Sequence, residues 1–484
     1  MKPVHILKYS ILTILIAGSL TGCTSRSGNW VKKEINVNLT KSHLKVDGFG
    51  VNITPAQWHD GKLKPVLDML TDDLGSTLFR FDCTGLANWL DPAKRQPNGT
   101  WAEVYLDSVY RSKVFSDAWE TFRYLNKKSI EPFFNVSGRI NPGLGKKDEW
   151  NTLVDFDGYA EMVTTMLKWA REKEGLKFRF LAPFNETDLG YSEGPKIDGS
   201  HMLTATRAII KKLDANGLKD INLIAIDDAH WKLDKLEAVL SDSSYANRIL
   251  AFGTHDYGDG DFGDVNESEE AGFPGTIKNS AFRNASAWMT EYGDLDQTFE
   301  IEYEFAWRST RRLMKSLSNG YSAAIAWDAF DNFHAHDTIW AEYGLLNTDT
   351  VNWIYTPRKR YYAARQVYKF VLPGWKMVET TAPLPTKFDV YKQWHDPFRN
   401  LRVLAFASPD GNDYTILIMN AIESDVDMSI NLNDTGTVSL PKTLHHFVTD
   451  KADNCTEKKD PSINNHTIRV LLPKNSISTI TTLK

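Results

Sequence analysis

The chain has 484 residues, of which 42 % are hydrophobic and 24 % are charged, a composition that argues against a disordered, collagen-like or coiled-coil protein. At about 150 residues per domain, this length predicts two to three domains. The net charge of −6 gives no reason to expect nucleic acid as a partner. Three cysteines are too few for a disulfide framework or a four-thiolate zinc site. The composition therefore predicts a large globular protein with more than one domain.

The first 23 residues have the pattern of a bacterial export signal. Lys2 and Lys8 provide a basic start, and the apolar run 11–20 is too short to span a bilayer. The run ends in LTGC, which resembles the lipobox motif, in which the cysteine is lipidated. We therefore expect residues 1–23 to be a lipoprotein signal peptide, with Cys23 holding the protein at the bacterial cell envelope through a lipid anchor only. The alternative is an ordinary signal peptide in which Cys23 is incidental.

Between residues 46 and 365, short apolar runs alternate with longer amphipathic stretches. This alternation predicts a parallel α/β fold, and eight repeats predict a (β/α)8 TIM barrel. A doubly wound sheet is the alternative, but it would normally show a glycine-rich phosphate loop after an early strand, and none is visible. The expected strands are 48–53, 76–81, 132–137, 178–183, 221–226, 249–254, 286–290 and 323–327. The expected helices are 63–74, 112–127, 159–174, 202–215, 231–240 and 299–317.

Residues 366–484 consist of short alternating segments separated by Pro, Gly, Asn and Asp. This pattern predicts an appended antiparallel β-sandwich, which we expect to brace the barrel because no row of exposed aromatic residues marks a ligand face. Residues 24–45 are expected to be a tether followed by a strand, 30–39, that pairs with the sandwich. Cys83 and Cys455 are expected to be free thiols, with a bridge between them as the alternative. The expected sandwich strands are 388–393, 401–407, 414–420, 426–432 and 467–472.

Two glutamates follow apolar runs at the ends of the fourth and seventh expected strands. Glu186 stands in FNETD and Glu291 in WMTEY. The C-terminal strand ends of a TIM barrel form its functional face, so both carboxylates are expected there. A carboxylic acid with a raised pKa can protonate a leaving oxygen, and an ionised carboxylate can attack an anomeric carbon. Each glutamate alone could be a surface acid, but their joint placement favours a catalytic pair.

With these residues the chain resembles the glycoside hydrolases of clan A, and within that clan family 30. Asn185-Glu186 matches the acid/base motif after strand four, and Thr290-Glu291 matches the nucleophile after strand seven. The resemblance covers residues of about 40 to 484, and its landmarks agree in order and spacing. It implies a TIM barrel with a β-sandwich and retaining hydrolysis of β-glycosides. Its further landmarks are Arg80 in LFRF, the segment THDY from Thr254 to Tyr257, the barrel entry VDGFG and the segment 362–374.

Five residues around the glutamates receive roles from this resemblance and from their places at strand ends. Arg80 would hold the nucleophile and lower its pKa, with a simple internal ion pair as the alternative. Asn185 would donate to the 2-hydroxyl of the substrate. His255 and Tyr257 would line the pocket, with plain packing as the alternative. Trp327, at the end of strand eight, would form the floor of the subsite for the cleaved sugar, with a core position as the alternative.

Two departures from the family pattern leave the substrate open. Thr187 follows the acid/base where the family usually has proline, and the segment 135–139 lacks the tryptophan-rich sequence of many members. Arg139 and the pair Asp227-Asp228 are candidates for setting sugar specificity. Family relatives suggest β-1,6-glucan or β-1,6-galactan as the leading substrates among oligo- and polysaccharides. The rival function is a glycan-binding lipoprotein that kept the fold without catalysis.

Three other motifs are not expected to bind a nucleotide or a metal, so we expect neither a cofactor nor a metal. Residues 258–263 match G-x-G-x-x-G, but the acids between the glycines would repel a pyrophosphate. The acidic stretch 256–270 lacks the order of an EF-hand and is expected to be a solvated loop. His334 and His336 lack further metal ligands on the other expected strands.

Overall fold

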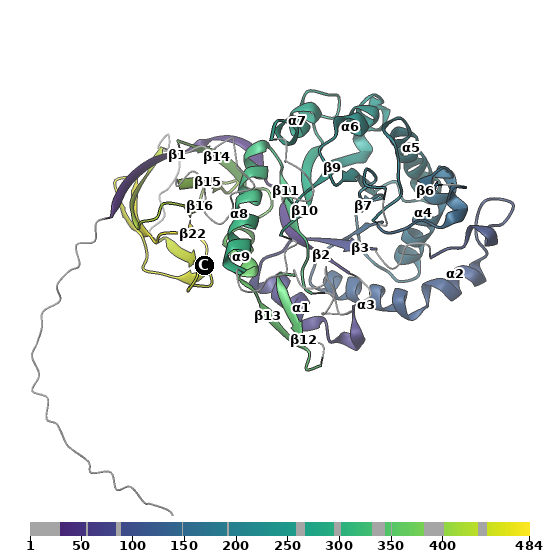
Figure 1. Ribbon diagram of the computed structural model, residues 1–484, viewed down its shortest axis with the longest axis horizontal. Coiled ribbons are helices and arrows are strands. Elements are labelled where there is room, and N and C mark those ends of the chain that lie inside the picture. The colour runs from purple at the N-terminus through teal and green to yellow at the C-terminus, as the bar shows by residue number, and fades with distance from the viewer. Residues whose placement is uncertain are drawn as a thin grey trace, which may run out of the picture.

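The computed structural model shows two units that lie side by side, a barrel surrounded by helices and a smaller β-domain (Figure 1). Cys23, the motif at 258–263, His334, His336 and the expected strand 388–393 lie outside the residues that the structure describes. The described residues are 30–54, 57–83, 89–147, 149–190, 193–257, 267–294, 302–331, 344–349, 351–381, 401–433 and 443–484.

The larger unit is a closed barrel of eight parallel strands, which confirms the predicted TIM barrel. Neighbouring strands follow the order β10-β11-β2-β3-β4-β7-β8-β9. Every one overlaps an expected strand, because strands covered by helices outside and side chains inside appear in the sequence as nearly continuous apolar runs. Their bounds are β2 (Gly48–Ile53), β3 (Leu78–Asp82), β4 (Phe133–Asn135), β7 (Phe180–Ala182), β8 (Asn222–Asp228), β9 (Ile249–Asp256), β10 (Ser286–Tyr292) and β11 (Ala323–Ala326).

The barrel interior changes character along the strands. Near their beginnings, Trp288 packs against Phe133 in an apolar cluster that also contains the small Ala251 and Ala323. Such a mixture of large and small side chains fills the interior of a TIM barrel. Towards the C-terminal ends the interior is polar, and buried polar groups cost free energy unless they bond to one another. The side chains of this polar layer are Asn52, Arg80, Asn135, Asp227 and His255.

The helices that surround the barrel include a counterpart for each expected one. The first is shorter than expected, because the chain passes from α1 into a π-helical turn at Met69–Asp73. The sequence did not predict α2 or α7. The helices are α1 (Lys64–Asp68), α2 (Glu103–Tyr110), α3 (Lys113–Lys127), α4 (Phe156–Glu172), α5 (Gly199–Ala215), α6 (Leu233–Leu240), α7 (Glu267–Lys278), α8 (Glu302–Asn319) and α9 (Lys359–Tyr368). Two hairpins, β5 (Gly145–Lys146) with β6 (Glu149–Leu153) and β12 (Leu346–Asp349) with β13 (Ile354–Pro357), extend from the barrel loops.

The expectation of a solvated acidic loop at 256–270 is wrong at both ends of the segment. Asp256 is the last residue of β9 and Glu270 lies in α7, and both are buried. The Nζ of Lys315 lies 3.1 Å from the carboxylate of Asp256 and 3.0 Å from that of Glu270. Burial raises the pKa of Glu270 to about 7, with Lys315 lowering it and Asp256 raising it. These acids therefore belong to a buried charge cluster between the barrel wall and its helices.

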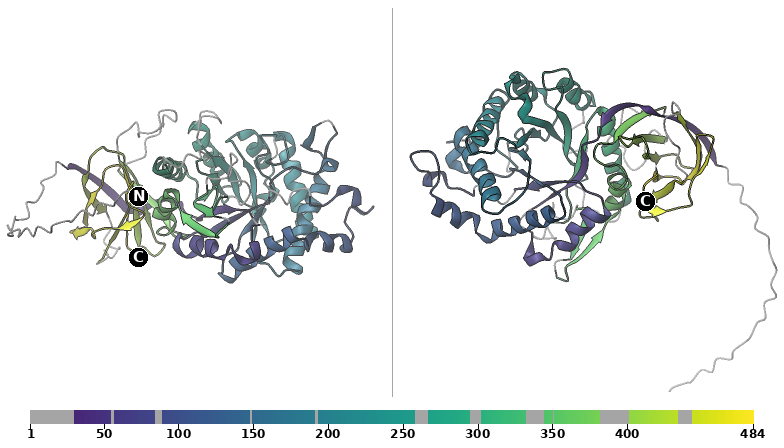
Figure 2. Two further views of the ribbon diagram at one scale, coloured as in Figure 1. Left: turned by 60° about the horizontal axis from the view of Figure 1, so that its bottom comes forward. Right: turned by 180° about the vertical axis from the view of Figure 1, so that it is seen from behind.

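The smaller unit is one ten-stranded sheet that curls around its own core (Figure 2). The strand β1 (Val31–Lys45) lies inside the sheet, antiparallel to β14 (Lys376–Thr380) and parallel to β17 (Val426–Asn433). The expected sandwich is thus built from a single sheet whose two halves are joined through β1. The other strands are β15 (Leu401–Ala407), β16 (Tyr414–Asn420), β18 (His445–Thr449), β19 (Thr456–Glu457), β20 (Ser462–Asn464), β21 (Thr467–Leu472) and β22 (Ser476–Thr481).

The helix α9 joins the two units, because it packs against β18 and β22 of the β-domain. The side-chain amide of Gln366 donates to Thr449 Oγ1 at 2.8 Å, and the backbone oxygen of Gln366 accepts from Thr479 Oγ1 at 2.7 Å. Beside them, Phe370 stacks on Phe447 with ring centroids 4.6 Å apart. These buried contacts fix the β-domain against the outer surface of the barrel.

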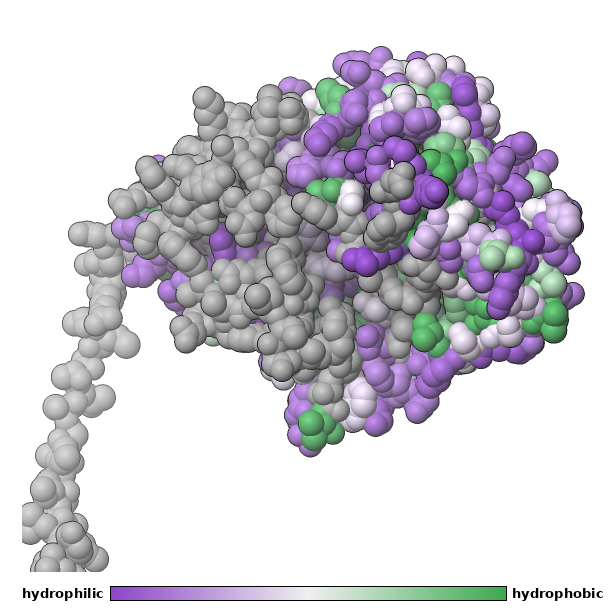
Figure 3. Space-filling view, turned by 45° about the vertical axis from the view of Figure 1, so that its right-hand side comes forward, coloured by the Kyte–Doolittle hydropathy of each residue, from purple (hydrophilic) through white to green (hydrophobic). Residues whose placement is uncertain are grey.

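The surface on the face shown in Figure 3 is mostly hydrophilic, and hydrophobic residues form small separate patches. Among the described residues, the most exposed large apolar side chains are Val104 and Val351, which lie on different elements. Scattered exposure of this kind is normal for a folded protein. The part of the chain that the structure describes contains no helix with the length and apolar character needed to cross a bilayer. Cys83 and Cys455 are buried free thiols, as predicted.

Candidate active site

Glu186 lies just beyond the end of β7, in a turn of left-handed backbone. Its φ is 44°, and its backbone amide donates to the carbonyl oxygen of Asp227 on β8 at 2.8 Å. A non-glycine residue with positive φ is uncommon, and such residues are concentrated at functional sites. Glu186 Oε1 lies 2.9 Å from Nδ1 of His255, and the residue is 9 % exposed. The carboxylate is therefore held by the barrel wall while a small part of it remains accessible.

Glu291 lies near the end of β10 and is 4 % exposed. Arg80 Nη1 donates to Glu291 Oε1 at 2.7 Å, and the Tyr257 hydroxyl donates to Oε2. Each oxygen of this carboxylate thus accepts a hydrogen bond from a group on another strand or loop. Hydrogen bonds and positive charge of this kind favour the ionised form of a carboxyl group.

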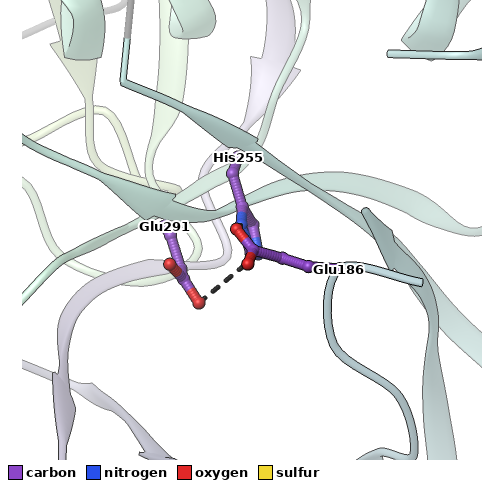
Figure 4. Close-up of side chains that lie close together, drawn as sticks. All are labelled: Glu186, His255 and Glu291. Atoms are coloured by element: carbon purple, nitrogen blue, oxygen red, sulfur yellow. Dashed lines mark hydrogen bonds and ion pairs between the residues drawn. The ribbon is translucent and has the colours of Figure 1, made fainter. Parts of the chain in front are cut away.

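The two glutamates come from opposite parts of the barrel and meet at its mouth. Figure 4 shows their carboxylates turned toward each other beside the ring of His255. One oxygen of Glu186 lies within 4.8 Å of one oxygen of Glu291. Carboxyl groups about 5 Å apart can act on the same glycosidic bond, one as acid and one as nucleophile, whereas a separation of about 6.5–9.5 Å leaves room for a water.

Arg80 is the centre of the polar layer and has no exposed surface. Besides its bond to Glu291, Nη1 donates to Asn52 Oδ1 at 2.6 Å. Nη2 donates to Asn185 Oδ1 at 2.6 Å and to Asp227 Oδ2 at 3.0 Å. Burial alone would lower the pKa of Arg80, but the charges of Asp227 and Glu291 raise it above its ordinary value. Arg80 is therefore a buried cation whose geometry fixes the positions of four neighbours.

His255, on β9, is a second buried cation. Burial lowers its pKa, but the charges and hydrogen bonds of Glu291, Asp227 and Glu186 outweigh this and raise the pKa of His255 to about 10. The ring is therefore protonated at neutral pH. Its Nε2 lies 3.4 Å from Asp227 Oδ1 and 3.5 Å from Glu291 Oε1, while Nδ1 is bonded to Glu186. One imidazolium ring thus faces three carboxylates.

Burial is the strongest influence on Glu291 and raises its pKa to about 7, with Glu186 adding to the rise. His255, Arg80 and the hydroxyl of Tyr257 lower the same pKa. The sequence-based expectation that Arg80 lowers this pKa is right for that contact, but the effect of burial is larger. Glu291 is therefore ionised above about pH 7 and progressively protonated below it.

Asn185 is anchored on both sides of its amide group. Its Oδ1 accepts from Arg80, and its Nδ2 donates to the backbone oxygen of Glu193 at 3.0 Å. Gly194 lies so close that a Cβ there would come within 1.7 Å of the Asn185 backbone oxygen, so this position requires glycine. An amide nitrogen has two N–H donors, and no group among the described residues accepts from the second one, so it can donate to a ligand.

Trp327 follows β11 at the barrel mouth and is partly exposed. Its backbone amide donates to the backbone oxygen of Tyr292 at 2.8 Å, which places it beside the strand that carries Glu291. Among the described residues, no hydrogen bond or ring contact joins Trp327 to the polar layer. The structure thus brings six of the seven predicted site residues into one bonded group and places Trp327 at its edge.

Thr187, which follows Glu186 in the sequence, belongs to a buried network of its own. Its hydroxyl donates to Asp228 Oδ1 at 2.6 Å and accepts from Lys235 Nζ at 2.7 Å. Lys235 Nζ also lies 2.8 Å from Asp228 Oδ2. These bonds connect the turn that carries Glu186 to β8 and α6. Thr187 therefore fixes this turn through side-chain hydrogen bonds that a proline could not make.

The expectation that Asp227 and Asp228 select the sugar is wrong, because both are buried among protein groups. Sequence reasoning also missed Asn52 and Asn135. Asn52 donates to the backbone oxygens of Thr290 and Ala326, at 3.1 and 3.2 Å. The available signal was an asparagine inside an otherwise apolar barrel strand, where a polar side chain needs a buried partner.

The close packing of Glu186, His255 and Glu291 could also accommodate a metal ion. Each ligand atom here already has a partner, however, because Arg80 bonds Glu291 and His255 bonds Glu186. The two cations would also repel a metal ion at this distance. The donor set therefore suits proton transfer and nucleophilic attack better than metal binding. The second group of this kind among the described residues lies on the β-domain and consists of His445, Glu457 and Asp460.

We expect Tyr257→Phe to move the acidic limb of the kcat/KM pH profile to higher pH. The hydroxyl lowers the pKa of Glu291, so its loss raises that pKa further, and the ionised form of Glu291 is then lost at a higher pH. A hydrogen bond to a charged group contributes about 1.5 kcal/mol or more, which corresponds to a shift of about one pH unit. The measurement is kcat/KM between pH 5 and 9 on a chromogenic glycoside.

Tyr292→Phe is the matched control for this variant. The Tyr292 hydroxyl is buried but bonds to the hydroxyl of Tyr368 at 2.7 Å rather than to a carboxylate. Its removal should leave the acidic limb where it is in the native protein. An unmoved limb in Tyr257→Phe, or an equal movement in both variants, would contradict the assigned role of Tyr257.

Neither protein-family models nor curated proteins gave a match to this sequence. Solved structures match it in fold. An endoxylanase of glycoside hydrolase family 30 from Clostridium papyrosolvens C71 has a TM-score of 0.69 and 17 % identity, over 93 % of this chain and 100 % of that chain. An endo-β-1,6-glucanase has a TM-score of 0.66 and 15 % identity, over 95 % of this chain and 94 % of that chain. An exported protein from Bacteroides fragilis has a TM-score of 0.68 and 12 % identity, over 93 % of this chain and 100 % of that chain. The chain therefore has the fold of these structures over nearly its whole length, and the similarity to the family 30 endoxylanase agrees with the sequence resemblance.

Proposed function

We propose that this protein hydrolyses a β-linked glycan through a covalent glycosyl-enzyme. The observation that carries the proposal is the pair of carboxylates within 4.8 Å of each other at the barrel mouth, each with different partners. Both oxygens of Glu291 accept hydrogen bonds from Arg80 and Tyr257, which suits a nucleophile that reacts as an anion. Glu186 has His255 as its side-chain partner and suits the proton transfers. The spacing matches the short separation typical of retaining glycosidases.

In the first step Glu186 donates its proton to the glycosidic oxygen while a carboxylate oxygen of Glu291 attacks the anomeric carbon. The bond from that carbon to the glycosidic oxygen breaks, and the leaving group departs as a neutral alcohol. A bond between the anomeric carbon and Glu291 forms in its place. The free N–H of Asn185 can donate to the 2-hydroxyl, an interaction that strengthens in the transition state.

In the second step Glu186 acts as a base instead of an acid. As a carboxylate it takes a proton from a water molecule, and the water oxygen attacks the anomeric carbon. The bond to Glu291 breaks, and Glu291 leaves as the anion that Arg80 and Tyr257 are placed to bind. His255, as a cation 2.9 Å from Glu186, stabilises the negative charge that Glu186 carries between the two steps. Two inversions give a product with the β configuration of the substrate.

The leading substrates are β-1,6-glucan and β-1,6-galactan. Support comes from the family resemblance and from the structural similarity to an endo-β-1,6-glucanase. Other similar structures are described as xylanases, so xylan belongs in the same test. We place the protein at the bacterial cell envelope, held by a lipid on Cys23, because the LTGC motif follows a basic and apolar leader.

The experiment is sugar release from a panel of β-linked glucans, galactans, xylans and mannans, with Glu291→Gln run beside the native protein. We expect one class of glycan to be cleaved by the native protein and left intact by the variant. Cleavage that persists in the variant would contradict the site assignment. Retention of a glycan on the immobilised native protein, without release of sugar, would support the glycan-binding alternative instead.

A further inference from the structure

Asp227 occupies an unusual position at the end of β8. Both it and Ile226 have left-handed backbone, with φ of 63° and 72°. The pairing of β8 with β9 shifts between Ile226 and Asp228, which is the signature of a β-bulge. A bulge redirects a side chain relative to the regular alternation of a strand. Here it turns the Asp227 carboxylate toward the polar layer, where the residue has no exposed surface.

Four strands other than its own contribute groups to the Asp227 carboxylate. Oδ2 accepts from Arg80 Nη2 of β3 and from Asn135 Nδ2 of β4, both at 3.0 Å. Oδ1 accepts from the Thr290 hydroxyl of β10 and lies 3.4 Å from His255 Nε2 of β9. The proposed reaction gives this fully buried carboxylate no step of its own. Its contacts are instead with the side chains that hold the two glutamates.

Gly253 on β9 leaves the space that this carboxylate fills. A Cβ at position 253 would lie 2.5 Å from Asp227 Oδ1 and 3.0 Å from Thr290 Oγ1. Real Cβ atoms do not approach other heavy atoms this closely, so a larger residue would displace the carboxylate. The position of Asp227 thus depends on the bulge in β8 and on Gly253 in β9.

We infer that Asp227 is the positioning residue that holds both catalytic glutamates in place, through Arg80 on one side and His255 on the other. The inference rests on the proposed function for the roles of the glutamates. Arg80 joins Asp227 to Glu291, with distances of 3.0 and 2.7 Å on its two nitrogens. His255 joins Asp227 to Glu186, with 3.4 and 2.9 Å on its two ring nitrogens. The Asp227 backbone oxygen also accepts from the Glu186 amide, so the turn of Glu186 is held as well.

The negative charge of Asp227 also influences the pKa values of the neighbouring side chains. The charged groups that contact its carboxylate are Arg80 from β3 and His255 from β9, and these two cations in turn contact Glu291 of β10 and Glu186 of the turn after β7. Burial raises the pKa of Asp227, but Arg80 and His255 lower it to about 2, so Asp227 stays ionised throughout the working range. Without this charge two cations would face only the two glutamates. Glu291 and His255 would then each lose a proton at lower pH.

The test is Asp227→Asn, which keeps the shape of the side chain and removes its charge. We expect kcat/KM at the optimum to fall by about 100-fold, because the glutamates lose their geometry. The acidic limb of the pH profile, which follows the ionisation of Glu291, should move to lower pH by about one unit. In 15N NMR of histidine-labelled protein, the titration of His255 should shift downward by about one unit or more. Gly253→Ala, which displaces the carboxylate and keeps its charge, should also lower kcat/KM.

Asp228→Asn is the matched control, because Asp228 is the next residue, equally buried and paired with Lys235 instead of Arg80 and His255. It should leave the His255 titration unchanged. The inference is overturned if Asp227→Asn folds and leaves the His255 titration and the acidic limb unmoved, or if Asp228→Asn moves them equally. The NMR titration needs no substrate. It therefore decides the role of Asp227 even if the glycan panel shows no cleavage and the proposed function fails.

Discussion

Replacing Glu291 with alanine is expected to lower kcat/KM for a β-glycoside by about 10⁴-fold or more, the scale on which loss of a central catalytic group acts. The variant removes the atom that would bond to the anomeric carbon, while Arg80 and Tyr257 remain to bind an anion in the empty space. Added azide should enter that space and restore part of the rate. Because azide would attack from the side that Glu291 occupies, the product should be the α-glycosyl azide.

Glu270→Gln is the control for this result. Glu270 is also a buried glutamate beside a cation, but it lies in α7 and pairs with Lys315 of α8, outside the barrel. Since burial already raises its pKa to about 7, the neutral glutamine should be tolerated and the activity should stay within about tenfold of native. A β-glycosyl azide from Glu291→Ala, or an activity close to native, would show that Glu291 is not the nucleophile.

For Glu186→Ala the expected loss depends on the leaving group of the substrate. With an alkyl alcohol as leaving group, kcat/KM should fall by about 10²- to 10⁴-fold, because proton transfer to the departing oxygen is lost. With a dinitrophenolate leaving group, which departs without a proton, kcat/KM should fall by less than about tenfold. The second step still lacks its base, so a glycosyl-enzyme should accumulate on Glu291. Azide, which needs no base, should then release the β-glycosyl azide.

The control for this variant is Glu161→Gln. Glu161 is mostly buried and pairs with Lys212 at 2.7 Å, but it lies on α4 outside the barrel. It should show no dependence on the leaving group beyond that of the native protein. If Glu186→Ala loses the same factor on both substrates, Glu186 acts through the fold or through binding, and its role as acid is contradicted.

The barrel strands could be predicted because each is covered on both sides, so its residues form an apolar run that ends in polar residues. The helices were harder to place from their patterns. Of the eight residues of α2 only Tyr110 is buried, so the helix has no apolar stripe that faces the core. In α7 the sequence begins with acids and contains Pro274, and proline inside a helix is normally unfavourable. Its buried Glu270 shows that tertiary contacts with Lys315 outweigh these local preferences.

The candidate site, like the fold, could be predicted from the sequence only in part. Glu186, Glu291, Arg80 and His255 could be found from strand ends and family motifs, because the barrel brings its C-terminal strand ends together. Asp227 could not be assigned correctly, because a one-residue bulge decides whether it faces the mouth or the polar layer. Neither the bulge nor the contacts across the barrel have a local sequence signal, since they depend on the tilt and stagger of all eight strands.

The measurement that tests the central claim most directly is the configuration of the first sugar released by the native protein. It is made by 1H NMR of the anomeric proton in the first minutes of hydrolysis, before the product equilibrates in water. Double displacement through Glu291 predicts that the β anomer appears first and the α anomer only later. An initial α anomer would mean a single displacement by water, and it would contradict the covalent mechanism that the close pair of Glu186 and Glu291 supports.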